Sequence, residues 1–484
     1  MSLVIGNVRR SILEGKGLAT LPAPTVTLPS GYDPNDTLTA IYGVDFPDYR
    51  NSPSTKNAGI GKRTYAAKDM TLEIAKATKF HASTATVAST NQYIKVGHDD
   101  FVGKGPFKIR ECVTSLGSDG KQHVMHYKDD IEKQNPNQTY PWYNSTYAMN
   151  TNYNTMIEFP KFYYRRPSPY EFQVSSTKHP GFECSPMHSR NDTEYPYCYI
   201  SKYQLQTTNY YSYCNTVSNT TATKVKCATV RETLNSKGLR LFDYKCYYSL
   251  AMLMFIKYAV LNASNFIGVG TQATVSGTTY APSRMIYLQS NPAMRYCTEA
   301  NSGTSSTNTV FNGYGSNDTS KRSFILTLGL ELYYGHSWIP LDGLYYYNSA
   351  LWISKDPTTL PAANMTVASI TNASNFDSLY LNMRDFRASG KDSLDYKSSK
   401  TFAYFPNYPY LLIPSSGDSS YNIGIGDRFL YNNVTTTGGT TEPRMATGCG
   451  QSLNSLGAGP SALGLAGLVS NSKAEIGFRS FFVA

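Results

Sequence analysis

The chain has 484 residues, which corresponds to two to four domains at roughly 100 to 200 residues per domain. Only 16% of the residues are charged and 40 are tyrosines, which argues against a helical cytosolic enzyme and favours strands, turns and contact surfaces. The net charge of +10 comes from scattered basic residues and not from a dense patch, which argues against nucleic-acid binding.

The eight cysteines include no CxxC pair and are too sparse for a disulfide framework. We therefore expect free, mostly buried thiols in a protein made in a reducing cytosol. The first residues lack the apolar core of a signal peptide, and the most apolar later stretch, 247–256, is too short to span a bilayer. We expect no membrane insertion.

The first 38 residues contain four prolines and little periodicity, and this pattern is typical of an extended arm without its own core. From 39 to 194, short runs with period-two character, such as 107–110 and 123–127, predict a β-rich domain. The stretch 129–155 is rich in Asn, Tyr, Pro and Thr, which indicates a long ordered loop, and a strand is expected over 156–164.

One segment of the third region, 195–484, has a clear helical pattern. It follows Asp243, a suitable N-cap, and its apolar residues repeat at spacings of three and four, at Tyr247, Leu250, Ala251, Met254, Phe255, Tyr258 and Leu261. Because it is apolar nearly all round, we expect a buried helix. Short strands and loops rich in Gly, Ser, Thr and Asn are expected after it.

The sequence offers no recognisable catalytic set. Neither HExxH nor a Walker motif nor a GxSxG elbow occurs, and most of the seven histidines are isolated. We therefore predict a protein that is not an enzyme, with no catalytic residues, no metal and no cofactor.

The most informative pattern is G-x-E-x-x-x-G-x-x-W-x-x-x-D-G, followed more than 100 residues later by a terminal GFR. Its residues are Gly329, Glu331, Gly335, Trp338, Asp342 and Gly343, then Gly477, Phe478 and Arg479. This pattern resembles the C-type lectin-like domain of bacteriophage structural proteins, a lineage that includes formylglycine-generating-enzyme-like domains and retroelement-diversified adhesins. The segments 41–46, 157–161 and 199–203 add to the resemblance.

The resemblance implies structural roles for these residues. Trp338 would be a core anchor, Glu331 and Asp342 would hydrogen-bond loop backbone, and Arg479 would tie the termini together. Neither an EPN nor a WND sugar-binding triplet accompanies Asp342, and calcium binding there is left open. The family's oxidase activity needs a pair of cysteines near the end of the domain, whereas Cys449 stands alone.

In the family, function lies in the loops before the last strands. The candidate ligand-binding residues there are Tyr431, Asn432, Asn433, Thr435, Gln451, Asn454, Ser455, Asn471 and Ser472. Their polar and amide side chains suit hydrogen bonds to a glycan or a protein. Diversified adhesins carry many aromatic residues in such loops, whereas 446–472 contains none, and this favours a structural use.

The prediction is a mainly β protein with an α+β C-terminal part: an extended attachment arm (1–38), a β-rich domain (39–194) and a C-type lectin-like domain with one long buried helix (195–484). We expect a bacteriophage virion component of the tail or capsid, made in the host bacterial cytoplasm, that binds a host-surface receptor. The alternative is a decoration protein that joins virion subunits. The expected partners are other virion proteins through the arm, a host glycan or protein, and further copies of the chain in a trimer.

Overall fold

The computed structural model describes about half of the chain, and the predicted arm 1–38 lies outside the described part. The described residues are 40–46, 61–65, 75–76, 103–134, 152–205, 210, 212, 225–259, 261, 274–275, 278–279, 310–312, 321–323, 326–331, 333–335, 337–347, 350–360, 376–382, 393–396, 398–418, 429–432, 443–450, 458–465 and 476–484. The fold is mainly β, as the composition predicts.

The first sheet is built from the N-terminal part of the chain. Its strands, in spatial order, are β3 (Ala75–Lys76), β2 (Lys62–Tyr65), β1 (Tyr42–Asp45), β8 (Glu171–Ser175), β7 (Tyr163–Ser168) and β9 (Glu183–Cys184). All of its pairs are antiparallel.

The second sheet joins strands that are far apart in the sequence. Its order is β13 (Arg240–Leu241), β29 (Ser480–Val483), β12 (Tyr197–Ser201), β6 (Asn154–Pro160), β4 (Arg110–Leu116) and β5 (Gln122–Tyr127). The C-terminal strand β29 thus lies inside the sheet, between β13 and β12. Strands β6 and β12 come from opposite sides of the expected domain boundary between residues 194 and 195, and they pair in this sheet. One sheet therefore connects the two expected domains, and the boundary between them stays a prediction.

The third sheet comes from the C-terminal half. Its order is β22 (Phe376–Asn382), β21 (Ala350–Ser354), β20 (Ile339–Tyr347), β27 (Arg444–Gly448), β28 (Leu463–Leu465), β26 (Phe429–Asn432) and β23 (Ser393–Tyr396). Two-stranded ribbons complete the described strands: β10 (Ser189–Arg190) with β11 (Thr193–Glu194), β14 (Thr274–Val275) with β15 (Thr278–Thr279), β16 (Val310–Asn312) with β17 (Lys321–Ser323), β18 (Leu326–Thr327) with β19 (Leu330–Glu331), and β24 (Ser398–Phe402) with β25 (Pro414–Asp418).

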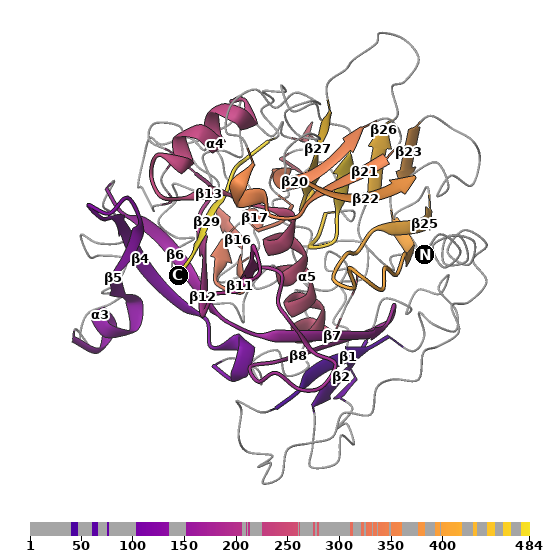
Figure 1. Ribbon diagram of the computed structural model, residues 1–484, viewed down its shortest axis with the longest axis horizontal. Coiled ribbons are helices and arrows are strands. Elements are labelled where there is room, and N and C mark those ends of the chain that lie inside the picture. The colour runs from indigo at the N-terminus through magenta and orange to yellow at the C-terminus, as the bar shows by residue number, and fades with distance from the viewer. Residues whose placement is uncertain are drawn as a thin grey trace.

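Helix α5 (Tyr244–Tyr258) lies in the centre of the molecule (Figure 1). It packs against β1, β2 and β8 of the first sheet and against β20 of the third. The Asp243 side chain accepts a hydrogen bond from the Cys246 N–H, and the helix ends at Ala259, whose φ of 54° is left-handed. The prediction of a buried helix capped by Asp243 is confirmed, except that Leu261, the last residue of the predicted repeat, lies beyond the end of the helix.

The sequence reading missed two shorter helices. Helix α3 (Lys128–Gln134) occupies the start of the segment 129–155. The prediction of a loop was therefore wrong for these first residues. Two acidic residues in its first turn and Lys133 in its last turn complement the helix dipole. Helix α4 (Cys227–Asn235) is short and presents Cys227, Val230 and Leu234 to the core.

The run at 123–127 lies in strand β5, which pairs antiparallel with β4, but the run at 107–110 needs a correction. Residues 105–107 form the 3-10 helix η1 (Gly105–Phe107), with Pro106 in its first turn, and the strand begins at Arg110. The segment expected as one strand over 156–164 is divided between β6 and β7. A second 3-10 helix, η5 (Pro357–Thr359), follows β21.

In the described ranges, no helix combines the length and the apolar character needed to cross a membrane. The six described cysteines are free, and all except the half-buried Cys184 are buried, as the sequence predicts for these six.

Candidate functional site

The glycines of the motif are required by backbone geometry. Gly329 lies in the turn between β18 and β19 with a φ of +75°, and a Cβ atom there would lie 3.0 Å from the Ile157 Cδ1 atom. Gly343 lies within β20 with a φ of +77°, and its Cβ would lie 2.4 Å from the Pro357 Cγ atom. A side chain at either position would be strained by the left-handed backbone, and at Gly343 it would also clash with Pro357, whereas at Gly329 the Ile157 side chain would have to move slightly.

Arg479 joins three separate segments from a fully buried position. Its Nη1 donates to the carbonyl oxygens of Ser201 at 2.8 Å and Lys202 at 2.9 Å, and its Nη2 donates to the Glu331 carbonyl. Burial lowers the pKa of Arg479 to about 10, so the guanidinium stays charged at neutral pH. Arg479 therefore connects the last strand to β12 and to β19.

Trp338 connects the same motif to the end of the chain. Only 8% of its surface is exposed, and its backbone forms a parallel bridge with Ile476. The Gly477 N–H donates to the Trp338 carbonyl at 3.0 Å, and Phe478 beside it is fully buried. Trp338 is therefore buried, and its role as a core anchor stays a prediction.

The N-cap of helix α5 is also half of a buried ion pair. The Arg190 Nη1 atom pairs with the Asp243 carboxylate, and its Nη2 atom lies 3.3 Å from Asp243 Oδ1. Burial opposes the charge on Arg190, but the Asp243 carboxylate outweighs it and raises the pKa of the guanidinium. The guanidinium also lies 4.6 Å from the Phe481 ring centroid, so the pair connects β10, α5 and β29.

Asp342 takes part in a second buried pair, with Arg231 of helix α4. Its Oδ1 atom accepts hydrogen bonds at 2.9 Å from the Gly343 N–H and from the Tyr345 hydroxyl. Arg231 Nη2 donates to the Tyr345 oxygen at 2.9 Å, which closes the group. The Asp342 side chain therefore bonds to the backbone of the next residue of its own strand β20, and the predicted bond to loop backbone stays a prediction.

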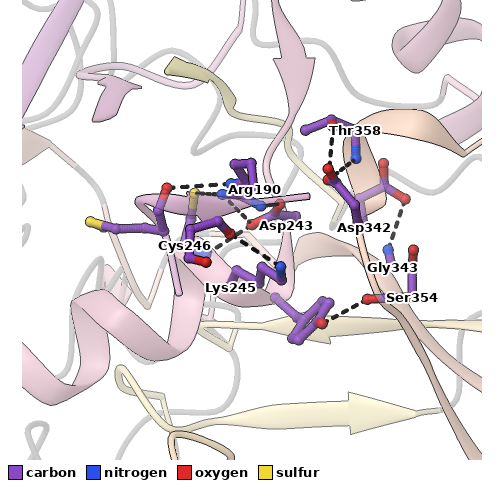
Figure 2. A network of polar contacts seen from close by, with 12 residues as sticks. Arg190, Asp243, Lys245, Cys246, Asp342, Gly343, Ser354 and Thr358 are labelled. Atoms are coloured by element: carbon purple, nitrogen blue, oxygen red, sulfur yellow. Dashed lines mark hydrogen bonds and ion pairs between the residues drawn. The ribbon is translucent and has the colours of Figure 1, made fainter. Parts of the chain in front are cut away.

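The two ion pairs are neighbours in space. Asp243 and Asp342 form a parallel backbone bridge, and the Asp342 N–H donates to the Phe242 carbonyl at 3.0 Å. Figure 2 shows Arg190, Asp243 and Cys246 on one side of this network and Asp342 with Gly343 on the other. Each carboxylate faces a guanidinium and backbone N–H groups, which suits a structural role better than that of a general base.

Lys245 lies at the edge of this network (Figure 2). Its Nζ donates to the Ser189 carbonyl at 3.2 Å, and burial lowers its pKa to about 8, with the nearby Arg190 acting in the same direction. The amine therefore loses its proton more readily than an exposed lysine does.

His188 is buried and bonded on both ring nitrogens. Its Nε2 donates to the Phe159 carbonyl at 3.1 Å, because a carbonyl can only accept, and Nδ1 is 3.2 Å from the Ser185 hydroxyl. Ser185 in turn contacts the Ser249 hydroxyl at 3.3 Å. Burial lowers the pKa of His188 to about 3, so it is neutral near pH 7 and holds β6 against α5.

Sequence reasoning missed the cations of these networks. Arg190 and Arg231 pair with aspartates far away in the sequence, and Lys202 pairs with Glu111 at 2.7 Å. Of these cations, the sequence signals burial only for Arg231. It falls on the apolar side of a helical repeat that contains Cys227, Val230 and Leu234.

The predicted ligand-binding residues are only partly within the described structure. Tyr431 and Asn432 are the last two residues of strand β26, so their assignment to a loop was wrong, although their role in binding stays a prediction. Tyr431 pairs with Leu394 on one side and Leu465 on the other, which places it inside the third sheet. The other candidates lie outside the described residues, namely Asn433, Thr435, Gln451, Asn454, Ser455, Asn471 and Ser472.

Among the described residues, no group of three or more His, Cys, Asp or Glu side chains is placed to hold a metal ion. No protein-family model matches the chain, and no curated protein matches its sequence.

Proposed function

We propose that the chain is a bacteriophage virion protein of the tail or capsid, and that its residues 195–484 form a C-type lectin-like domain that binds a receptor on the host surface. The proposal includes neither catalysis nor a cofactor. It rests on the pattern of Gly329 to Gly343 and Gly477 to Arg479, together with the structural use of these residues.

The observation that carries the proposal is the burial of every charged residue of the pattern. Glu331, Asp342 and Arg479 are buried, Asp342 accepts a bond from the neighbouring Gly343 N–H, and Arg479 donates to the backbone of a distant segment at Ser201. Such residues stabilise a scaffold and leave recognition to other parts of the surface. In this proposal the loops around 433–435, 451–455 and 471–472 supply the contacts.

A single shallow polar site binds weakly, so several copies would be needed for firm attachment. We propose a trimer, in which avidity on the order of 10² or more is available, attached to other virion proteins through the arm 1–38.

Deletion of residues 1–30 should leave a folded protein that no longer enters particles. Normal incorporation of the truncated protein would exclude this role for the arm.

The second candidate function is a structural joint between virion subunits. It is favoured by one observation, the absence of aromatic residues from 446–472. Aromatic side chains dominate most recognition surfaces, so a loop region without them suits contacts inside an assembly.

The substitution Asn454→Trp distinguishes the two functions, because a large side chain in the loop blocks whichever surface binds there. If the loops bind a receptor, variant particles form normally and adsorb poorly to host cells. If the loops join subunits, the isolated protein folds but particles do not assemble. Met125→Trp is the matched control, since Met125 is 47% exposed on β5, and it should leave both assays unchanged.

A further inference from the structure

Four side chains form a row across the second sheet, on strands β29, β12, β6 and β4, which lie side by side (Figure 1). Phe482 of β29 is opposite Tyr199 of β12. Tyr199 is opposite Glu158 of β6, and Glu158 is opposite Arg110 of β4. Residues paired across antiparallel strands share one face of the sheet, with Cβ atoms about 4.5 to 5.5 Å apart. Tyr197, two residues before Tyr199, lies on the same face.

The aromatic end of this row reaches the surface at Tyr197. The rings of Tyr199 and Phe482 are stacked, with centroids 4.4 Å apart and an interplanar angle of 5°. The Tyr197 ring lies next to them, with its centroid 6.2 Å from that of Tyr199. Tyr197 is 41% exposed, whereas Tyr199 and Phe482 are buried. Two buried rings therefore support an exposed one.

Glu158 has one carboxylate oxygen that the described residues leave without a bond. The residue is only 3% exposed, and its Oε2 atom accepts hydrogen bonds from the hydroxyls of Tyr127 at 2.6 Å and Tyr199 at 2.8 Å. Burial and the bond to Glu158 raise the pKa of both tyrosines, so both stay protonated and donate. The Oε1 atom has no partner in the described part of the chain and is not fully buried, so it can accept from an outside donor.

Arg110 presents an open donor beside this acceptor. Its guanidinium carbon lies 3.6 Å from the Tyr127 ring centroid, and its Nε donates to Asp129 Oδ2 at 3.1 Å. Its Nη2 lies 3.9 Å from Asp130 Oδ2, whereas Nη1 bonds to none of the described residues. The Arg110 side chain is 36% exposed. Arg110 and Glu158 are opposite each other in register but form no ion pair within the described ranges, so donor and acceptor both remain open.

We propose that this face of the second sheet binds an uncharged hexopyranose unit of a glycan. The apolar face of the sugar ring stacks on Tyr197, which offers a flat apolar surface with a polar tip. Two neighbouring hydroxyls bridge the open pair: one donates to Glu158 Oε1, and the other accepts from Arg110 Nη1. The inference is independent of the virion assignment, and it uses none of the loop residues proposed to bind a receptor.

The charges around Arg110 select the class of sugar. The carboxylates of Asp129, Asp130 and Glu158 surround one guanidinium, so a carboxylated or sulfated sugar meets a repulsive surface. A cationic ligand is disfavoured as well, because Arg110 already covers the Tyr127 ring. Hydroxyls suit an open donor beside an open acceptor, since each hydroxyl can both donate and accept.

Saturation-transfer difference NMR on the full-length chain tests the proposal, because this method detects weak ligands of a large protein. The probes are the methyl glycosides of glucose, galactose and mannose, with methyl glucuronide as the anionic control. We expect at least one neutral probe to bind with a Kd of about 1 mM, with the strongest transfer to the hydrogens of its apolar face, and no transfer to the glucuronide. No transfer to any of the three neutral probes, or a preference for the glucuronide, overturns the proposal.

Substitutions of exposed side chains locate the site without removing a buried group. Tyr197→Ala and Arg110→Met should each weaken binding by about tenfold or more. The matched control is Leu116→Ala, which should leave the Kd unchanged, since Leu116 is 39% exposed on the same strand as Arg110 and lies about 20 Å along it. The Asn454→Trp protein should also bind the sugar normally, so this proposal and receptor binding by the loops can fail separately. Wild-type affinity of the Tyr197→Ala protein would place the sugar elsewhere and overturn the proposal.

Discussion

Replacement of Arg479 by methionine removes the buried guanidinium but keeps a long flexible side chain. Three backbone carbonyls, those of Ser201, Lys202 and Glu331, lose their charged donor, although the Lys202 carbonyl keeps a hydrogen bond from the Glu331 N–H at 3.0 Å. A buried acceptor left without a partner costs about 1 to 3 kcal/mol, and relief of the desolvation of the charge offsets part of the total. We therefore expect Arg479→Met to lower the free energy of unfolding by about 3 to 5 kcal/mol.

Urea unfolding followed by circular dichroism measures this loss, with the thermal midpoint as a second readout. The matched control is Arg240→Met on the neighbouring strand β13, where the side chain is only partly buried and donates to Asn235 Oδ1 at 2.8 Å. The control should change the free energy of unfolding by less than about 1 kcal/mol. An equally small change for Arg479→Met would refute the view that Arg479 holds the three segments together.

Three further substitutions test other parts of the scaffold. Trp338→Ala should destabilise by about 3 to 5 kcal/mol because a large buried ring leaves a cavity, and a loss below about 1 kcal/mol in thermal melts would contradict its role as a core anchor. Asp243→Asn should keep the helix cap but leave the Arg190 charge uncompensated, at a cost of about 3 to 5 kcal/mol in urea unfolding; unchanged stability would mean that the ion pair contributes nothing. His188→Gln tests the pH dependence of stability. In the unfolded chain His188 takes up a proton below about pH 6.5, whereas in the folded protein it does so only near its pKa of about 3. Acidification between these two values therefore destabilises the wild type by about 1.4 kcal/mol per pH unit through this group. The variant should lose that part of the slope of unfolding free energy against pH, and identical slopes for the two proteins would show that His188 does not titrate as described.

Local patterns in the sequence were sufficient for some of these features. Helix α5 follows from its apolar repeat and its Asp243 cap, whereas the burial of Trp338 was implied by the resemblance. The helix prediction succeeds because its determining residues lie within a few turns of one another. Helix α3 was missed because its polar surface gives little apolar periodicity, with Ile131 its one buried residue.

The polar networks depend on long-range contacts. Arg190 meets Asp243, and Arg231 meets Asp342, only after β10, α4, α5 and β20 have packed together. A single sequence contains no signal for which of many arginines will pair with which aspartate.

The most direct test of receptor binding is competition between the purified full-length chain and the particles that carry it. Folded protein is added to host cells in increasing concentration before the particles, and the rate of adsorption is measured. The account predicts a dose-dependent decrease in adsorption, which the Asn454→Trp protein fails to produce and the Met125→Trp protein reproduces. Adsorption that stays unchanged at saturating concentrations of folded, oligomeric protein would contradict receptor binding.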